Sequence, residues 1–231
     1  MATSSEGKIL QHTRHGLRMV GKKASFFDLP EPIWHPDEKS AVCDNCKNKF
    51  TITHRRHHCR RCGSVICSDC SEKQTLRRMG FVDPVLVCLH CARLCQGEEE
   101  FYKHHLKILE NGAYFELSDA DGIHNCKLSS DHFQIIVTGG SGSHPSLLMS
   151  SIMEIKSITG HAPDGTPTNK LNGLKLTYRS DTEDGEEIDV TLSPSPSHSR
   201  KQSIDWLKGL KKGLMIIHAR ERGNSCLVES N

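Results

Sequence analysis

The sequence of 231 residues is poor in aromatic side chains and contains no long apolar run. Aromatic residues make up 5% and hydrophobic residues 35%, which is too little for one large core and favours two modest domains. The longest apolar runs fall well short of the ~20 residues that a membrane-spanning helix needs. The opening stretch MATSSEGKILQHTRHG is polar, so no secretory signal is expected. Glycine after Met1 and a cysteine at a prenylation position are missing too, so no lipid anchor is expected.

Charge of one sign is not in large excess. The formal net charge is +2, with 16 basic and 12 acidic residues in positions 1–100 and 14 and 16 in the remainder. An extended basic stripe, typical of nucleic-acid-binding proteins, is missing, so no nucleic-acid partner is expected. A nucleophile placed near a base is not recognisable either, so the chain is not predicted to be an enzyme.

Cysteine, in contrast, is abundant, with eleven residues. Disulfides are uncommon inside cells, where this chain is expected to reside, so clustered cysteines indicate metal. A structural zinc site is typically closed and tetrahedral, with four protein ligands. Four C-x-x-C pairs supply enough sulfurs for two such sites. Reduced cysteines without metal would not explain the repeated spacing. The pairs are Cys43 and Cys46, Cys59 and Cys62, Cys67 and Cys70, and Cys88 and Cys91.

The spacing also bears on which pairs share an ion. Only four residues separate Cys62 from Cys67, which favours interleaved sites. Our hypothesis assigns the first zinc to Cys43, Cys46, Cys67 and Cys70, and the second zinc to Cys59, Cys62, Cys88 and Cys91. Three further cysteines are expected to be core or surface residues rather than ligands: Cys95, Cys126 and Cys226.

The densest positive charge lies in HRRHHCRRCG, from His54 to Gly63. Arg60 and Arg61 have a plain structural explanation, because arginines beside zinc-bound sulfurs can donate hydrogen bonds and offset the charge of the site. The residues before Cys59 have no sulfur to serve. In a strand, Arg56, His58 and Arg60 would share one face, which would suit a multiply charged anion such as a phosphate. The alternative is a solvated basic face.

The rest of the chain divides by pattern. ARLCQGEEEFYKHHLKILENG predicts a helix that stops at Gly112. From Tyr114 onward, short alternating runs separated by Asp-Gly and Gly-Gly turns predict six or seven strands. The stretch SIDWLKGLKKGLMIIHARERG predicts an amphipathic closing helix with Ser203 as a possible N-cap. The predicted segments are a flexible arm (1–27), a zinc finger (28–95), a linker helix (96–112), a β-rich domain (113–223) and a tail (224–231).

Residues 30–95 resemble the FYVE zinc-finger family, through WHPD (Trp34–Asp37), RRHHCR (Arg55–Arg60) and the eight-cysteine spacing. The resemblance implies a cross-brace finger that binds phosphatidylinositol 3-phosphate. It assigns Arg55 and Arg60 to the 3-phosphate, Arg56 to the 1-phosphate, and Asp37 and His58 to the inositol hydroxyls, with His57 lining the pocket. It also implies that Trp34 packs in support of the site.

Two further positions matter in this comparison. The family usually has an arginine two residues before the seventh cysteine, where this sequence has Leu86. A charge-assisted hydrogen bond contributes roughly 1.5–3 kcal/mol, so its loss would weaken lipid binding unless Arg77 or Arg78 compensates. Ile52 and Thr53 occupy the loop that resembles the family's membrane-inserting turret. Ile52 could instead pack beneath the finger.

The C-terminal half looks like a pleckstrin-homology-like (PH-like) domain, and the combination resembles proteins that join a FYVE finger to such a domain. The expected fold class is α+β: a small zinc-stabilised cross-brace finger followed by a PH-like β-sandwich or barrel with a C-terminal helix. The resemblance implies a cytoplasmic adaptor, peripheral on early endosome membranes. It also implies a role in adhesion turnover and migration at focal adhesions, with focal adhesion kinase or other adhesion proteins as partners. Rival interpretations are a protein-binding finger with weak or no lipid recognition and a RING-like ubiquitin ligase.

Overall fold

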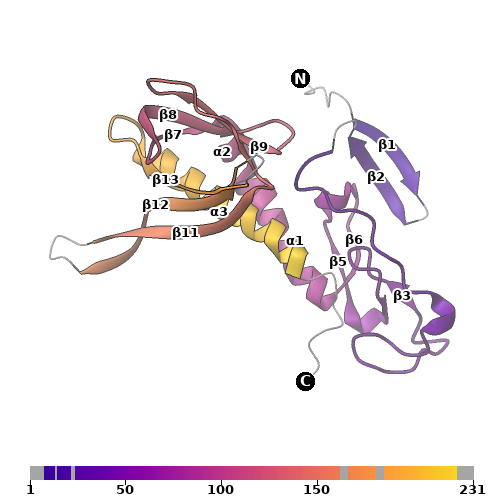
Figure 1. Cartoon of the computed structure of the whole chain (residues 1–231). Helices are drawn as coiled ribbons and strands as arrows, with labels where there is room; N and C mark the ends of the chain where they lie inside the picture. Colours follow the sequence, from indigo (N-terminus) through magenta and orange to yellow (C-terminus); the bar gives the residue numbers. More distant parts are fainter. Residues whose placement is uncertain (1–7, 14, 22–23, 162–165, 181–184, 223–231) are drawn as a thin grey trace. The chain divides into compact units, whose positions relative to one another are not determined.

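A computed structural model describes residues 8–13, 15–21, 24–161, 166–180 and 185–222. The chain forms two compact units, the finger unit (residues 1–100 with 216–231) and the C-terminal unit (residues 101–215). Figure 1 labels their elements. In the part of the chain that the structure describes, no helix is long and apolar enough to cross a membrane.

The finger unit consists of short elements. Its six strands pair as three separate antiparallel hairpins, β1–β2, β3–β4 and β5–β6. The strands are β1 (Lys8–Thr13), β2 (Gly16–Gly21), β3 (His57–His58), β4 (Val65–Ile66), β5 (Ser71–Gln74) and β6 (Val85–Cys88). Helix α1 (Leu89–His104) follows β6, and three single-turn helices lie between the strands: η1 (Asp37–Lys39), η2 (Ser68–Cys70) and η3 (Arg77–Met79). Two-stranded hairpins of this length are marginal on their own and need another source of stability.

The buried core of the finger unit is small. Seven cysteines cluster there with six apolar residues: Ile66, Leu76, Met79, Phe81, Val87 and Ala92. A core of this size supplies little hydrophobic stabilisation. The cysteine sulfurs must therefore do more than fill space, which agrees with the prediction that metal supports this domain.

The expectation of a flexible arm over residues 1–27 is wrong for the part that the structure describes. Strands β1 and β2 form a regular hairpin, with Ile9 opposite Val20. The hairpin is attached to the finger, because the Met19 N–H donates to the Gly80 carbonyl at 2.7 Å. The guanidinium of Arg18 lies 4.3 Å from the centre of the Phe81 ring. Local patterning could not reveal this hairpin, because the segment that anchors it comes much later in the chain.

The helix expected from Ala92 to Gly112 begins three residues earlier and is interrupted. Helix α1 starts at Leu89, so Cys91 and Cys95 lie within it. A second helix, α2 (Leu106–Asn111), follows His105. Gly112 ends α2 with a φ of 82°, as the sequence predicts. Residues 96–100, which were expected in the linker, belong to the finger unit.

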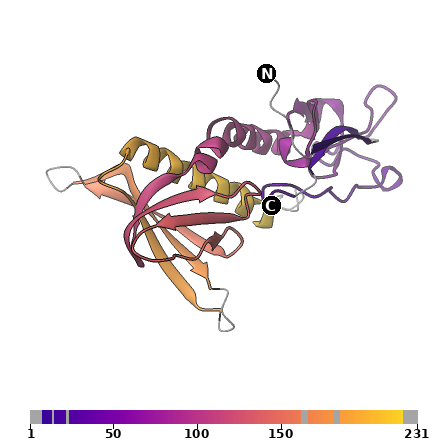
Figure 2. The same cartoon turned by 90° about the horizontal axis from the view of Figure 1, so that it is seen from above.

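The C-terminal unit confirms the predicted α+β, PH-like architecture. Its seven strands form one antiparallel sheet in the order β10-β9-β8-β7-β13-β12-β11. Figures 1 and 2 show the long helix α3 (Arg200–Arg222) running along this curved sheet. The strands are β7 (Ala113–Leu117), β8 (Ala120–Leu128), β9 (Gln134–Gly139), β10 (Leu147–Leu148), β11 (Ile152–His161), β12 (Pro167–Arg179) and β13 (Glu187–Pro194).

The apolar stripe of α3 forms the centre of this unit's core. Trp206, Leu207, Leu210 and Leu214 are all 0% exposed, and the three leucines follow the three- and four-residue steps that the sequence shows. The Trp206 Nε1–H donates to the Leu109 carbonyl at 3.1 Å, so the buried indole has its hydrogen-bond partner.

The expected N-cap of α3 is wrong by four residues. The helix begins at Arg200, and the Ser199 hydroxyl accepts a hydrogen bond from the Gln202 N–H at 3.3 Å. Ser203 lies inside the helix, where its hydroxyl donates to the Tyr114 carbonyl at 3.0 Å. Both serines precede an apolar repeat, and only the tertiary contact to Tyr114 distinguishes them.

We expect Gly80→Ala to detach the β1–β2 hairpin. Gly80 has a φ of +74°, and an added Cβ would lie 2.5 Å from the Met19 carbonyl oxygen. The left-handed backbone alone would cost about 1–3 kcal/mol. The measurement is the rate of tryptic cleavage after Arg18, followed by mass spectrometry, together with the melting temperature.

Gly97→Ala is the matched control, because its Cβ would meet nothing within 4 Å and it lies inside α1. This change should leave the cleavage rate unaltered and raise helix stability by up to about 1 kcal/mol. Equal cleavage rates in both variants would show that the hairpin does not depend on Gly80.

Candidate functional site

The structure brings the eight paired cysteines together in the two groups that the sequence predicts. In each group the sulfurs lie within 4.8 Å of one another. The Sγ atoms of Cys46 and Cys67 are 3.8 Å apart, and those of Cys62 and Cys88 are 4.0 Å apart. Sulfurs at about 2.3 Å from a tetrahedral zinc ion lie about 3.8 Å from one another. Both groups therefore fit zinc, and the finger holds two structural zinc ions.

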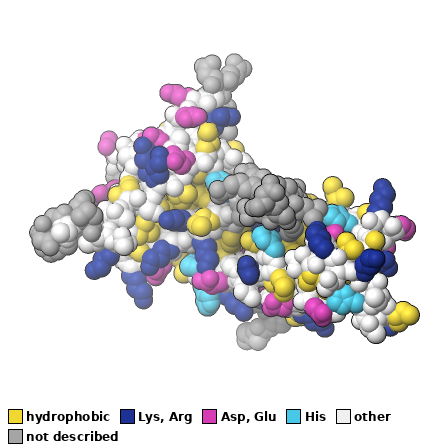
Figure 3. Space-filling model, turned by 90° about the horizontal axis from the view of Figure 1, so that it is seen from below, with side chains coloured by type: hydrophobic (Ala, Val, Ile, Leu, Met, Phe, Trp, Pro, Cys, Tyr) yellow, Lys and Arg dark blue, Asp and Glu magenta, His cyan; other side chains and the backbone are white. Residues whose placement is uncertain are grey.

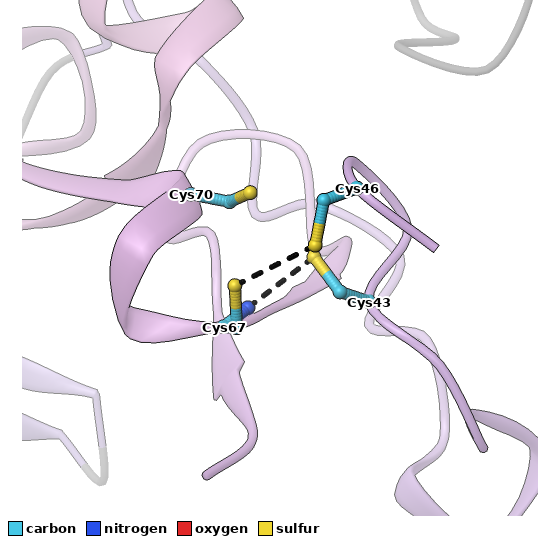
Figure 4. Close-up of side chains that lie close together, drawn as sticks. All are labelled: Cys43, Cys46, Cys67 and Cys70. Atoms are coloured by element: carbon cyan, nitrogen blue, oxygen red, sulfur yellow. Dashed lines mark hydrogen bonds between the residues drawn. The ribbon is translucent and has the colours of Figure 1, made fainter. Parts of the chain in front are cut away.

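Two turns that are distant in sequence supply each group. Figure 4 shows Cys43 and Cys46 facing Cys67 and Cys70, which flank or end η2. The turn at Cys43 is closed by the Lys47 N–H, which donates to the Cys43 carbonyl at 2.9 Å. The second group is built from the turn after β3, which carries Cys59 and Cys62, and from the β6–α1 junction, which carries Cys88 and Cys91.

The surroundings of the thiols favour metal binding. Burial alone raises the pKa of the Cys43 thiol, but nearby N–H groups outweigh that effect and lower the pKa to about 7. One of them, the Cys67 N–H, lies 3.4 Å from the Cys43 sulfur. In the second group, the neighbouring sulfurs of Cys62 and Cys88 raise the pKa of Cys59. A divalent cation stabilises the thiolate form of these sulfurs, so deprotonation and metal binding are coupled.

The basic run lies beside the second cysteine group, on strand β3 and its flanks. His57 and His58 pair with Ile66 and Val65 of β4. The His58 ring Nε2 lies 2.8 Å from the His35 carbonyl oxygen and 3.9 Å from an Asp37 carboxylate oxygen. The contact between His58 and Asp37 brings together two predicted head-group residues that are far apart in sequence.

Three arginines of the run direct their guanidinium groups to backbone carbonyls. Arg55 donates to the Ile52 carbonyl at 3.2 Å, Arg56 to Ser40 at 3.0 Å and Arg60 to His58 at 2.6 Å. Within the described residues, none of the three forms an ion pair with a carboxylate. Burial lowers the pKa of Arg60, although the neighbouring Cys59 thiolate partly offsets that effect. This surface therefore retains uncompensated positive charge.

Arg61 does not share the basic surface, and its described side-chain hydrogen bond goes to a carboxylate rather than to a sulfur. It donates to the Glu98 carboxylate at 2.8 Å, and Arg78 donates to the same oxygen at 2.6 Å. Arg78 is 2% exposed and Glu98 is 6% exposed. Burial lowers the pKa of Arg61, but the Glu98 charge more than offsets that effect and raises it. The interior of the finger thus contains two guanidinium groups on one carboxylate.

The sequence leaves open whether Arg77 or Arg78 compensates for Leu86, and the structure pairs both with carboxylates. Arg78 is buried and also donates to the Phe27 carbonyl at 2.6 Å. Arg77 donates to Glu99 at 2.8 Å. Leu86 itself lies on β6, and its carbonyl accepts the Arg60 N–H at 2.9 Å. Arg78 is therefore not available to an anion beside Leu86, and Arg77 is directed to Glu99.

Ile52 does not pack beneath the finger. Its side chain is 88% exposed, and Thr53 is exposed as well. The loop is a tight turn, because the Thr51 N–H donates to the His54 carbonyl at 3.0 Å. Figure 3 shows the finger at the right, where Lys, Arg and His side chains lie among protruding hydrophobic groups. An apolar residue presented beside cations is typical of a surface that meets a membrane.

Several residues that support the site, His15 and Glu98 among them, were not predicted from the sequence. The Trp34 ring stacks on His15 at 3.9 Å and meets His58 edge-on at 5.6 Å, so this tryptophan supports the site as the resemblance implies. Nothing in the pattern marked His15 or the carbonyl of His35. Glu98 was one of three consecutive glutamates, and only burial singles it out.

The comparisons identify the finger. The family model described as FYVE zinc finger matches residues 33–97. "Pleckstrin homology domain-containing family F member 2" of Danio rerio is 50% identical over 60 residues, which are 26% of this chain and 24% of that protein. Human "FYVE, RhoGEF and PH domain-containing protein 6" is 43% identical over 60 residues, 26% of this chain and 4% of that protein. The chain spans no more than about a quarter of these relatives. The solved structure of the "LM5-1 FYVE domain from Leishmania major" is 38% identical, covers 29% of this chain and 82% of that chain, and has a TM-score of 0.27.

The sites and this match together define a FYVE zinc-finger protein. A second family model, described as zinc finger FYVE domain-containing protein 21 C-terminus, matches residues 100–222, more than half of the chain. The chain therefore belongs to the family of zinc finger FYVE domain-containing protein 21.

Chelation should unfold the finger unit and spare the C-terminal unit. The two tryptophans report on the units separately, since Trp34 lies in the finger and Trp206 in the other core. Elemental analysis should find two zinc ions per chain, and a strong chelator should shift Trp34 emission to longer wavelength in a Trp206→Phe variant. In Trp34→Phe, the emission of Trp206 should not move. A chelator-resistant Trp34 signal would contradict a zinc-dependent core.

Glu98→Gln should destabilise the finger strongly, because it leaves two buried guanidinium groups without their carboxylate. Breaking a buried pair in this way typically costs about 3–5 kcal/mol. The loss in the free energy of unfolding is measured by urea unfolding, followed through Trp34 emission in the Trp206→Phe background. The control is Glu99→Gln, whose partner Arg77 has a side chain that is 53% exposed, and we expect a loss of about 1 kcal/mol or less. Similar losses in both variants would argue against the buried triad.

Proposed function

We propose that this chain is a non-enzymatic adaptor that binds phosphatidylinositol 3-phosphate in membranes through its FYVE finger. The observation that carries the proposal is the set of three arginines, Arg55, Arg56 and Arg60, beside the second zinc group. Their guanidinium groups contact carbonyl oxygens and, among the described residues, no carboxylate. Phosphate oxygens are the ligands that complete such guanidinium groups.

The roles follow the resemblance. Arg55 and Arg60 bind the 3-phosphate, Arg56 binds the 1-phosphate, and His57 lines the pocket. Asp37 and His58 accept or donate hydrogen bonds to the inositol hydroxyls. Support comes from the His58 ring, which lies 2.8 Å from the His35 carbonyl oxygen and 3.9 Å from the Asp37 carboxylate, so that two of these residues are neighbours. The lowered pKa of Arg60 is consistent with a guanidinium that an anion would stabilise.

Ile52 and Thr53 enter the membrane in this proposal. Burying one exposed isoleucine contributes about 1.5–3 kcal/mol, which is too little for stable attachment. The Arg55 guanidinium contacts the Ile52 carbonyl, so loop and head-group residues are directly linked. Head-group contacts and insertion therefore act together, as two weak membrane signals do in other peripheral proteins.

The C-terminal unit is proposed to bind protein rather than lipid. Its first two strands, β7 and β8, carry Lys127 as their one lysine and hold acidic residues at Glu116 and Asp121. A role in adhesion turnover and migration, with focal adhesion kinase or other adhesion proteins as partners, is proposed from the family resemblance alone. The same holds for location on early endosomes and at focal adhesions. A protein-binding finger without lipid recognition is the second candidate, because of Leu86. The FYVE match speaks against the RING-like ligase.

The proposal predicts selective sedimentation of the full-length, zinc-loaded protein with vesicles that contain phosphatidylinositol 3-phosphate. The vesicles in each arm should differ only in their phosphoinositide. Arg60→Ala should lower affinity about ten- to a hundredfold, because it removes a charge-assisted hydrogen bond worth roughly 1.5–3 kcal/mol. Ile52→Ser should weaken binding without changing the preference among lipids.

Arg93→Gln is the matched control, since Arg93 is an exposed cation of α1. It should leave affinity within about twofold of the wild type, as expected for a single exposed charge that is not among the proposed contacts. If the zinc-loaded protein sedimented with none of the phosphoinositide vesicles, the lipid-binding proposal would be refuted and the protein-binding finger favoured. An equal loss of affinity in Arg93→Gln and Arg60→Ala would show that the effect arises from net charge alone.

A further inference from the structure

The β5–β6 hairpin places one lysine on the same face as a zinc ligand. Lys73 lies opposite Leu86 in the strand register, and Ser71 lies opposite Cys88. Alternate residues of a strand share a face, so Leu86 and Cys88 point the same way. Residues that are directly opposite in an antiparallel pair also share a face, with Cβ atoms about 5 Å apart. Lys73 therefore belongs to the face that carries Leu86 and Cys88.

This face borders the basic surface. Cys88 belongs to the second zinc group together with Cys59 and Cys62, which flank Arg60 in sequence. The Arg60 N–H donates to the Leu86 carbonyl at 2.9 Å, which fixes the backbone of the basic run against β6. Leu86 therefore contacts Arg60 through its backbone and lies opposite Lys73 in the hairpin.

Lys73 is also a cation that is open to a ligand. Its side chain is exposed, and in the described residues it forms no ion pair. The neighbouring Glu72 lies opposite Val87, on the other face of the hairpin. Arg77 and Arg78 are committed to Glu99 and Glu98. A lysine has a flexible four-carbon stem, so its ammonium can reach past the shorter Leu86 side chain.

We propose that Lys73 is a phosphate-binding residue of the head-group site and supplies, across the hairpin, the positive charge that Leu86 does not. The inference rests on the proposed lipid-binding function and deepens it. Arg60 is assigned to the 3-phosphate, so Lys73 lies on the 3-phosphate side of the pocket. An ammonium acts as a point charge without the bidentate geometry of a guanidinium. Lys73 would therefore add affinity that falls with salt more than it adds geometric selectivity.

The test uses the full-length, zinc-loaded protein and phosphatidylinositol 3-phosphate vesicles, with zinc content and Trp34 emission as checks of folding. Lys73→Met should lower affinity about tenfold or more, as expected for the loss of a charge-assisted contact. Lys73→Arg should retain binding. Arg93→Gln removes the same charge from an exposed position of α1 and should change affinity by less than about twofold.

The decisive variant is Leu86→Arg in the Lys73→Met background. An arginine at position 86 would project from the same face, so it should restore most of the lost affinity, and the two substitutions should be strongly non-additive. Binding by Lys73→Met that equals the wild type would overturn the inference while leaving the proposed function intact. Equal losses in Lys73→Met and Arg93→Gln would also overturn it. If the wild type bound no phosphoinositide, the proposed function and the inference would both fail.

Discussion

The finger depends on the coordination of two zinc ions by eight cysteine thiolates. Its hairpins are too short, and its apolar core too small, to hold together through hydrophobic burial alone. Each four-thiolate zinc site carries a formal charge of −2, which brings negative charge into the interior. The positive charge of the run from His54 to Gly63 is best understood against this background. Metal coordination creates both the rigidity of the finger and the electrostatic setting of its arginines.

The arginines of that run divide between two tasks. Arg61 turns inward and shares the Glu98 carboxylate with Arg78, beside the second zinc group. Burial lowers the pKa of Arg61, but the Glu98 carboxylate and, to a smaller extent, the Cys91 sulfur raise it. Arg55, Arg56 and Arg60 turn to backbone carbonyls and keep positive charge at the surface. One short stretch thus stabilises the interior and forms the proposed phosphate site.

The folded finger extends beyond the segment that its motifs define. Phe27 and the β1–β2 hairpin precede those motifs, and Glu98 follows the last residue of the FYVE match. All three contact the short stretch from Arg78 to Val82 or its arginine. A fragment cut at the motif boundaries would lose the carboxylate that neutralises two buried guanidinium groups. The stability of this finger therefore depends on residues that carry no family signature.

Sequence alone determined the parts of this protein in which a short pattern has one physical meaning. Repeated C-x-x-C spacing predicted two zinc groups and their membership, and the apolar steps at Leu207, Leu210 and Leu214 predicted the buried face of α3. The exposure of Ile52 and the approach of His58 to Asp37 followed the family resemblance.

Only the tertiary structure decided which charged residues are buried, which hairpins dock and which side chains share a face. Glu98 differs from its glutamate neighbours solely because two arginines meet it in the interior. Ser199 rather than Ser203 caps α3 because Ser203 contacts Tyr114. Lys73 lies beside Leu86 because of the strand register. These outcomes depend on contacts between residues far apart in the chain, and local propensity carries no information about them.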